Sequence, residues 1–189
     1  MSCETSLIHR RRIQVVPYDP AWPEIFEELS APLRGALRGV IDSVEHVGST
    51  SVPGLAAKPI IDIDVVVPAA AYVLTAIERL ACLGYAHSGD QGIAGREAFT
   101  SPAGFYTHHL YVCVQGSVAL ENHLVVRNYL RNDPEMAVAY SALKAELAER
   151  FGDDPASYGA GKTNFLLALL AKAGTSGDVL QQVRRENSA

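Results

Sequence analysis

Two aspartates separated by one residue interrupt an apolar run, and their spacing suits a hard cation. Asp62 and Asp64 lie within Ile60–Val67, a β-branched stretch that predicts a buried strand. Side chains alternate along a strand, so both carboxylates share one face, with their Cα atoms roughly 6–7 Å apart. At an effective dielectric constant of ~20 the two charges repel by about 2–3 kcal/mol, which a bound divalent cation turns into attraction. Asp62 and Asp64 are therefore the candidate metal ligands and catalytic residues.

A turn of small residues precedes the aspartates and is a candidate phosphate site. Gly48, Ser49, Thr50 and Ser51 follow a short strand expected at Ile41–Val47. Small residues and main-chain N–H groups at the end of a strand commonly cradle phosphate. A phosphate site beside a metal site predicts phosphoryl or nucleotidyl transfer, in which cations neutralise the triphosphate and activate an acceptor hydroxyl.

Several basic residues are further candidate phosphate ligands. Lys58 precedes the strand that carries the aspartates, and Arg96 offers a planar guanidinium suited to bidentate phosphate contact. Arg127 and Arg131 stand four residues apart on one helix face, which a solvated basic face would show equally well. His109 lies in an expected strand, where a structural and an accessory catalytic role both remain open.

The pattern of a hydrophobic residue, Gly-Ser, a gap and Asp-x-Asp resembles the signature of the nucleotidyltransferase superfamily, and a longer set of residues resembles the GrpB family. The resemblance covers roughly Val15 to Ala173. The matching residues are Tyr18-Asp19-Pro20-x-Trp22, Glu45-His46-Val47-Gly48-Ser49-Thr50-Ser51-Val52-Pro53-Gly54-Leu55, Lys58-Pro59, Gly95-Arg96-x-x-Phe99, His109-Leu110, Arg127-x-Tyr129-Leu130-Arg131, Leu143-Lys144 and Lys162-x-x-Phe165.

The resemblance implies a nucleotidyltransferase-like fold, Mg²⁺ or Mn²⁺ as the metal, and a nucleoside triphosphate, with ATP expected, as the substrate. It leaves the acceptor undefined, and some members of the family are fused to dephospho-CoA kinase. It also implies that Lys162, at the start of the last expected helix, approaches the nucleotide.

Two positions depart from the family pattern. Tyr111 replaces a histidine and Asn128 replaces an aspartate, and no third carboxylate is evident on a later strand, where Glu97 is the acidic residue to test. These departures favour an alternative from another class of protein. In that alternative the chain is a catalytically degenerate module that binds a nucleotide, a coenzyme-like ligand or a partner protein without turnover.

The elements that position these residues predict an α+β fold, with a mixed sheet flanked by helices and a helical C-terminal half. We expect a single domain over residues 13–174, with flexible tails at 1–12 and 175–189. Strands are expected at 41–47, 60–67, 97–101 and 105–114, and helices from Asp19-Pro20 to Leu37 and at 71–83, 119–131, 134–151 and 162–173.

Composition excludes several classes of protein. The 189 residues are 48% hydrophobic and 20% charged, with a net charge of -5, so no basic field indicates nucleic-acid binding. Three widely spaced cysteines suggest neither a disulfide framework nor a zinc site, which fits a cytoplasmic protein, and no run is long enough to cross a membrane. Gly159–Thr163 ends in Gly-Lys-Thr but lacks the first glycine of a P-loop. The oligomeric state is left open.

Overall fold

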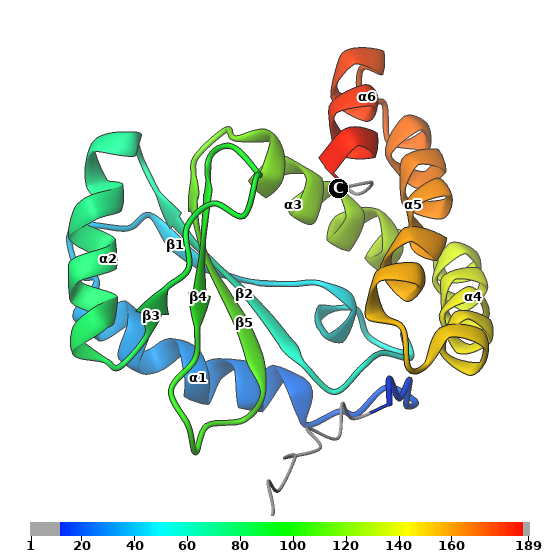
Figure 1. Ribbon diagram of the computed structural model, residues 1–189, viewed down its shortest axis with the longest axis horizontal. Helices are drawn as coiled ribbons and strands as arrows, with labels where there is room; N and C mark the ends of the chain where they lie inside the picture. The colour runs from blue at the N-terminus through cyan, green and yellow to red at the C-terminus, as the bar shows by residue number, and fades with distance from the viewer. Residues whose placement is uncertain (1–11, 187–189) are drawn as a thin grey trace, which may run out of the picture.

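A mixed sheet lies at the centre of the computed structural model, which describes residues 12–186 (Figure 1). Its strands are β1 (Ser43–Val47), β2 (Ile61–Val67), β3 (Ala86–His87), β4 (Arg96–Thr100) and β5 (His108–Val114). They are ordered β1-β2-β5-β4-β3, with β2 and β5 parallel and the other neighbours antiparallel. The expected α+β architecture with a mixed sheet is confirmed.

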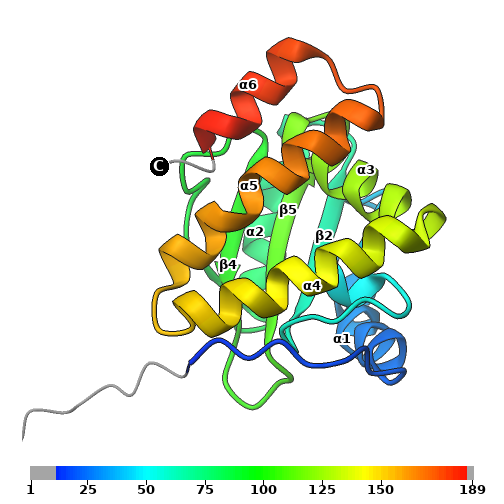
Figure 2. The ribbon, with the colours of Figure 1, turned by 90° about the vertical axis from the view of Figure 1, so that its right-hand side faces the viewer.

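Helices cover both faces of this sheet. They are α1 (Trp22–Ala36), α2 (Val73–Cys82), α3 (Val118–Asn132), α4 (Pro134–Phe151), α5 (Pro155–Lys172) and α6 (Gly177–Glu186), with 3₁₀ turns η1 (Ser49–Ser51) and η2 (Ala70–Tyr72). Helices α1 and α2 lie on one face, whereas α3, α4 and α5 lie on the other, where α4 and α5 cross in front of the strands (Figure 2). The C-terminal half is helical, as expected.

Alternation along β2 separates an apolar face from a polar one. Ile61, Ile63 and Val65 are fully buried against α1, in a core that includes Trp22 and Leu33. The alternate side chains of β2 point toward α3, and these include both aspartates. One strand therefore anchors the core and carries the site.

Asp-Pro pairs start α4 and α5, two of the three helices on the polar face. Asp133 accepts a hydrogen bond from Met136 N before Pro134, and Asp154 accepts one from Ser157 N before Pro155. Helix α5 therefore begins well before residue 162, so Lys162 lies within the helix and not at its start. Gly161 also lies within α5, where it packs against Leu147 of α4, so this segment is helical and is no P-loop.

The chain after Gly174 corrects one expectation. Its polar composition predicts a flexible tail, but Gly177–Glu186 forms helix α6, whose Val183 is buried against Leu167 and Leu170 of α5. Tertiary packing thus orders a segment that the composition alone leaves loose. Residues 1–11 and 187–189 of the expected tails lie outside the described residues. None of the helices within 12–186 is long and apolar enough to cross a membrane.

Candidate functional site

The turn after β1 packs directly against the first aspartate. Gly48 has φ +68°, and a Cβ built there would lie 2.1 Å from Asp62 Oδ2, so glycine is required for both reasons. Ser51 Oγ donates to Gly48 O (2.6 Å), and Thr50 Oγ1 donates to Ile60 O (3.3 Å). These two hydroxyls hold the turn together. Ser49 of the turn lines two cavities that are described below.

Each aspartate of the doublet hydrogen-bonds one histidine. His109 Nδ1 lies 2.8 Å from Asp62 Oδ1, and His123 Nδ1 lies 2.8 Å from Asp64 Oδ2. Burial acts to lower the pKa of His123, but the Asp64 carboxylate outweighs it and raises that pKa above its ordinary value. Asp64 is fully buried, and its Oδ1 has no hydrogen-bond partner among residues 12–186. An unpaired buried carboxylate oxygen is costly, which points to a missing ligand.

The donor set fits Mg²⁺ that is shared with a nucleotide. Asp64 Oδ1 is unpartnered and Asp62 Oδ2 faces the Gly48 turn, so each carboxylate keeps one oxygen away from its histidine. Within the described part of the chain, no group of three or more His, Cys, Asp or Glu side chains is arranged to hold a metal ion. Mg²⁺ usually keeps several waters and is bound by one or two carboxylates together with substrate phosphates. These residues suit that mode and not a cage made of protein alone.

A cavity of about 180 Å³ beside Asp62 is lined by three lysines, Lys58, Lys144 and Lys162. Lys144 is buried in the middle of α4, and its Nζ donates to Ala56 O. Burial and, less strongly, the charge of Lys162 lower the pKa of Lys144 to about 7. Burial and the charge of Lys58 lower the pKa of Lys162 as well. The cavity holds more positive than negative charge, so it favours an anion.

A second cavity, of about 240 Å³, meets the first at Ser49, Asp62 and Lys162. Its other walls are mainly apolar and aromatic, and they include Tyr111, Val126, Leu130, Tyr140 and Leu166. Asn122 also lines it, and the buried Oδ1 of Asn122 has no hydrogen-bond partner within residues 12–186. A cavity with aromatic and aliphatic walls and a free acceptor suits a flat, hydroxyl-bearing group.

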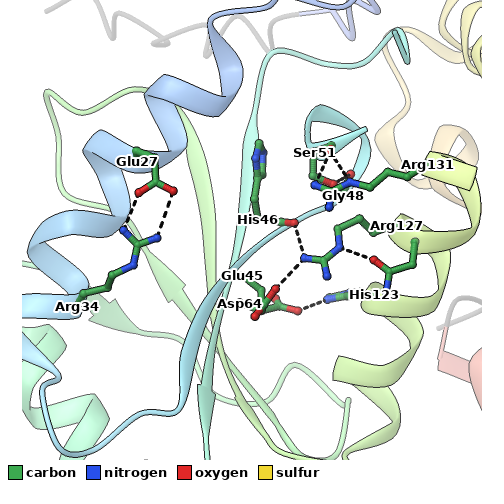
Figure 3. Close-up of polar contacts among 11 residues, drawn as sticks. Glu27, Arg34, Glu45, His46, Gly48, Ser51, Asp64, His123, Arg127 and Arg131 are labelled. Atoms are coloured by element: carbon green, nitrogen blue, oxygen red, sulfur yellow. Dashed lines mark hydrogen bonds and ion pairs between the residues drawn. The ribbon is translucent and has the colours of Figure 1, made fainter. Parts of the chain in front are cut away.

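The structure places Arg127 and Arg131 behind the turn, where they bind the protein and line neither cavity. Arg127 Nη1 donates to Glu45 Oε2 (2.8 Å) and to His46 O (3.0 Å). Arg131 donates from Nε (3.0 Å) and Nη2 (2.7 Å) to Ser51 O (Figure 3). Both were candidate phosphate ligands, with a solvated basic face as the alternative, but their donors hold β1 and the Gly-Ser turn in place.

Two other expected site residues are also placed away from the cavities. Arg96 is buried, with its Cζ 4.4 Å from the centroid of the Tyr111 ring and its Nε without a partner in the described chain. Glu97 pairs in register with Val112, on the apolar face of the sheet, and bonds His87 Nε2 (2.6 Å). Glu97 therefore does not reach the doublet, because its side chain is on the face of the sheet opposite to Asp62 and Asp64.

Sequence reasoning missed three residues that the fold brings to the site. Lys144 and His123 come from helices α4 and α3, and Glu45 stands directly across from Asp64 on β1. Glu45 and Lys144 belong to motifs that the sequence shares with the GrpB family. Membership of these motifs is the sequence feature that could have indicated a role for Glu45 and Lys144, since periodicity alone assigns no role to a single polar residue.

The fold is like that of nucleotidyltransferases. A structure of the Cid1 poly(U) polymerase, an H336N mutant bound to MgATP, matches 78% of this chain and 50% of its own, with a TM-score of 0.55 and 15% identity. At that identity the likeness shows the fold alone.

The chain belongs to the GrpB family, since residues 12–172 match the family model described as GrpB protein. A crystal structure of GrpB from Enterococcus faecalis is 37% identical, covers 85% of this chain and 96% of its own, and has a TM-score of 0.76. A UPF0157 protein of Pseudomonas aeruginosa is 37% identical over 86% of this chain and 68% of its own length.

In two further relatives the match covers less than half of the relative's own length. The UPF0157 protein YqkA of Bacillus subtilis is 36% identical over 85% of this chain, which spans about half (47%) of that relative. A dephospho-CoA kinase of Mycolicibacterium paratuberculosis is 27% identical over 82% of this chain and 44% of its own length. The domain therefore occurs within larger chains.

Proposed function

We propose that this protein is a Mg²⁺-dependent nucleotidyltransferase that moves a nucleotidyl group from a nucleoside triphosphate, with ATP expected, to an acceptor still to be identified. One observation carries the proposal. Asp62 stands where the lysine-lined cavity and the aromatic cavity meet, beside the Gly48 turn and in line with Asp64. A nucleotide whose phosphates occupy one cavity and whose nucleoside occupies the other would place its α-phosphate at this junction.

The lysine-lined cavity binds the β- and γ-phosphates in this proposal. Lys58, Lys144 and Lys162 neutralise these phosphates, and Ser49 contacts the triphosphate. Asp62 and Asp64 hold Mg²⁺, which supplies charge neutralisation at the phosphates when it is bound. A bound anion stabilises the charged forms of these lysines, because it offsets both their mutual repulsion and the cost of burying their charges.

The aromatic cavity takes the sugar and the base. Asn122 Oδ1 accepts a hydrogen bond from a sugar hydroxyl, which satisfies a buried acceptor that otherwise has no partner within the described residues. Tyr111 offers ring surface for the base. Tyr140 also lines the cavity, with its ring stacked on Phe165.

The reaction is an in-line displacement. The acceptor oxygen forms a bond to the α-phosphorus while the bond from that phosphorus to the pyrophosphate oxygen breaks, and the acceptor proton passes to solvent. The negative charge that builds on the leaving pyrophosphate is bound by the lysines of the first cavity. Arg127 and Arg131 act as positioning residues through the backbone carbonyls that they hold.

A binding module without turnover is the second candidate. The strand next to the doublet presents His109 and Tyr111 opposite Asp62 and Asp64, where no carboxylate is found. Such a protein would bind the same nucleotide and leave it intact.

Transfer of label from α-labelled ATP distinguishes the two candidates. Purified protein is incubated with Mg²⁺, labelled ATP and pools of RNA, protein and small-molecule acceptors, beside Asp64→Asn and the control Glu97→Gln, which alters an acid on the other face. Transfer that Asp64→Asn abolishes and Glu97→Gln retains supports the enzyme. Saturable binding of ATP without transfer to any pool favours the module, and absence of nucleotide binding overturns both.

A further inference from the structure

A third carboxylate, Glu45, lies beside the doublet. It is on β1, whereas Glu97, the acid to test, is on β4 on the other side of β2. Glu45 of β1 is paired in register with Asp64 of β2, so both side chains point to the face covered by α3 (Figure 3). Because Asp64 is fully buried and its Oδ1 has no partner among the described residues, the cluster still lacks a ligand on the side of Asp64.

Arg127 already neutralises this third carboxylate. Its Nη1 lies 2.8 Å from Glu45 Oε2, and the two side chains are 12% and 29% exposed. Burial acts to raise the pKa of Glu45, but the contact with Arg127 outweighs it and holds that pKa below its ordinary value. The same guanidinium atom donates to His46 O, and Arg127 Nε donates to Asn128 Oδ1 (3.0 Å), so Arg127 is fixed by three acceptors.

The opposite side of the doublet offers no acid and a second fixed cation. Strand β5 places His109 across from Asp62 and Tyr111 across from Asp64, and Arg96 stacks on the ring of Tyr111 at 4.4 Å. Two divalent cations close together need several carboxylates to offset their mutual repulsion. Here Asp62 and Asp64 supply two, and Arg127 takes up the charge of Glu45.

We propose that Arg127 stands in for a second divalent cation, so that Asp62 and Asp64 bind one divalent cation per chain together with the nucleotide. This inference rests on the proposed function and sets the number of metal ions that the site accepts. Arg127 thereby limits the metal site through Glu45 and does not contact the phosphates.

The number of bound Mn²⁺ ions tests the proposal without any need for turnover. Mn²⁺ is titrated into an equimolar mixture of the full chain and a non-hydrolysable ATP analogue, at concentrations where the two form a complex, and free Mn²⁺ is measured by electron paramagnetic resonance. All ions bound per complex are counted, so the ion shared by the analogue and the two aspartates counts as one. We expect one ion per chain for the unaltered protein. We expect two for Arg127→Gln, which frees Glu45, and one again for the double variant Arg127→Gln with Glu45→Gln.

Glu45→Gln alone keeps the test decisive if Arg127→Gln does not fold. Because Glu45 is no metal ligand in this account, the single variant should keep one ion and change its affinity by less than about threefold, the scale of a screened nearby charge. Two ions in the unaltered protein, one ion in a folded Arg127→Gln, or loss of the ion in Glu45→Gln overturns the inference while nucleotide binding, and so the proposed function, stands. No Mn²⁺ and no analogue bound by the unaltered protein would overturn both.

Discussion

Both faces of β2 contain fully buried side chains, but their chemistry differs. Ile63 on the face toward α1 and Asp64 on the face toward α3 are both fully buried. Burial of Ile63 stabilises the fold, whereas burial of a carboxylate with an unpartnered oxygen costs stability. A protein that retains such a cost at one place commonly uses it to bind a ligand. The comparison separates residues that hold the fold from residues that serve the site.

The largest effect should come from the apolar face. Ile63→Ala removes a fully buried side chain from a core with Leu33 and Leu110, so we expect the free energy of unfolding to fall by about 2–5 kcal/mol. Urea denaturation followed by circular dichroism measures it. The folded fraction should still bind ATP with unchanged affinity, and a loss of stability below 1 kcal/mol would contradict the division between the faces.

Gly48→Ala should have the next largest effect and should act on both stability and binding. A Cβ there meets Asp62 Oδ2 at 2.1 Å and φ is +68°, so we expect a cost of about 1–3 kcal/mol and a loss of Mg²⁺-dependent ATP binding. Gly39→Ala is the matched control, since Gly39 has φ +77° with nothing within 4 Å of a Cβ. If Gly39→Ala lowered ATP affinity as much as Gly48→Ala, the contact with Asp62 would not matter.

The sequence predicted the polar face only in part. The aspartate doublet and the Gly-Ser turn were recognisable because local spacing fixes both, and the bounds of α4 follow from the Asp-Pro cap and the period of its apolar residues. The spacing of Arg127 and Arg131 correctly put them on one helix face, but what they bind depends on the docking of α3 onto β1 and the turn.

Residues that act through long-range pairing could not be assigned from the sequence. Glu45 meets Asp64 only through the antiparallel register of β1 and β2. Lys144 reaches the cavity only because α4 packs against the segment that follows the Gly-Ser turn, at Val52 and Leu55. Val183 shows the same limit for the fold, since its burial depends on α5. Periodicity describes one element at a time and does not tell which elements meet.

The buried lysine should make nucleotide binding depend on pH. Burial lowers the pKa of Lys144 to about 7, so in the free protein its charge is present below that pH and is lost above it. ATP favours the charged form, so affinity should fall by up to about tenfold per pH unit as pH rises above 7. Isothermal titration calorimetry from pH 6 to 9 measures this.

Lys144→Met should remove that pH dependence, and Lys172→Met, at the exposed end of α5, should keep it. The stability of the free protein should move in the other direction. A lysine whose pKa is lowered by folding destabilises the fold while it is charged, so stability should rise as pH increases from about 7 toward the ordinary lysine pKa. An ATP affinity that is flat in the unaltered protein would contradict the placement of Lys144 in the phosphate cavity.

The smallest effect should come from a change of Glu97, which is on the face of the sheet opposite to the doublet. Glu97 bonds His87 at a partly exposed position, so Glu97→Gln should change the free energy of unfolding by less than about 1 kcal/mol. Thermal melts and ATP titrations with Mg²⁺ test this variant. Loss of metal-dependent binding in Glu97→Gln would mean that the acids of the site have been assigned to the wrong face.

Binding of ATP to Asp64→Asn, with Mg²⁺ and with EDTA, tests the central claim most directly. We expect Mg²⁺ to tighten ATP binding to the unaltered protein and this gain to disappear in Asp64→Asn, while the circular dichroism spectrum of the variant stays the same. A folded Asp64→Asn protein that keeps the full effect of Mg²⁺ would contradict the assignment of Asp64 as a metal ligand.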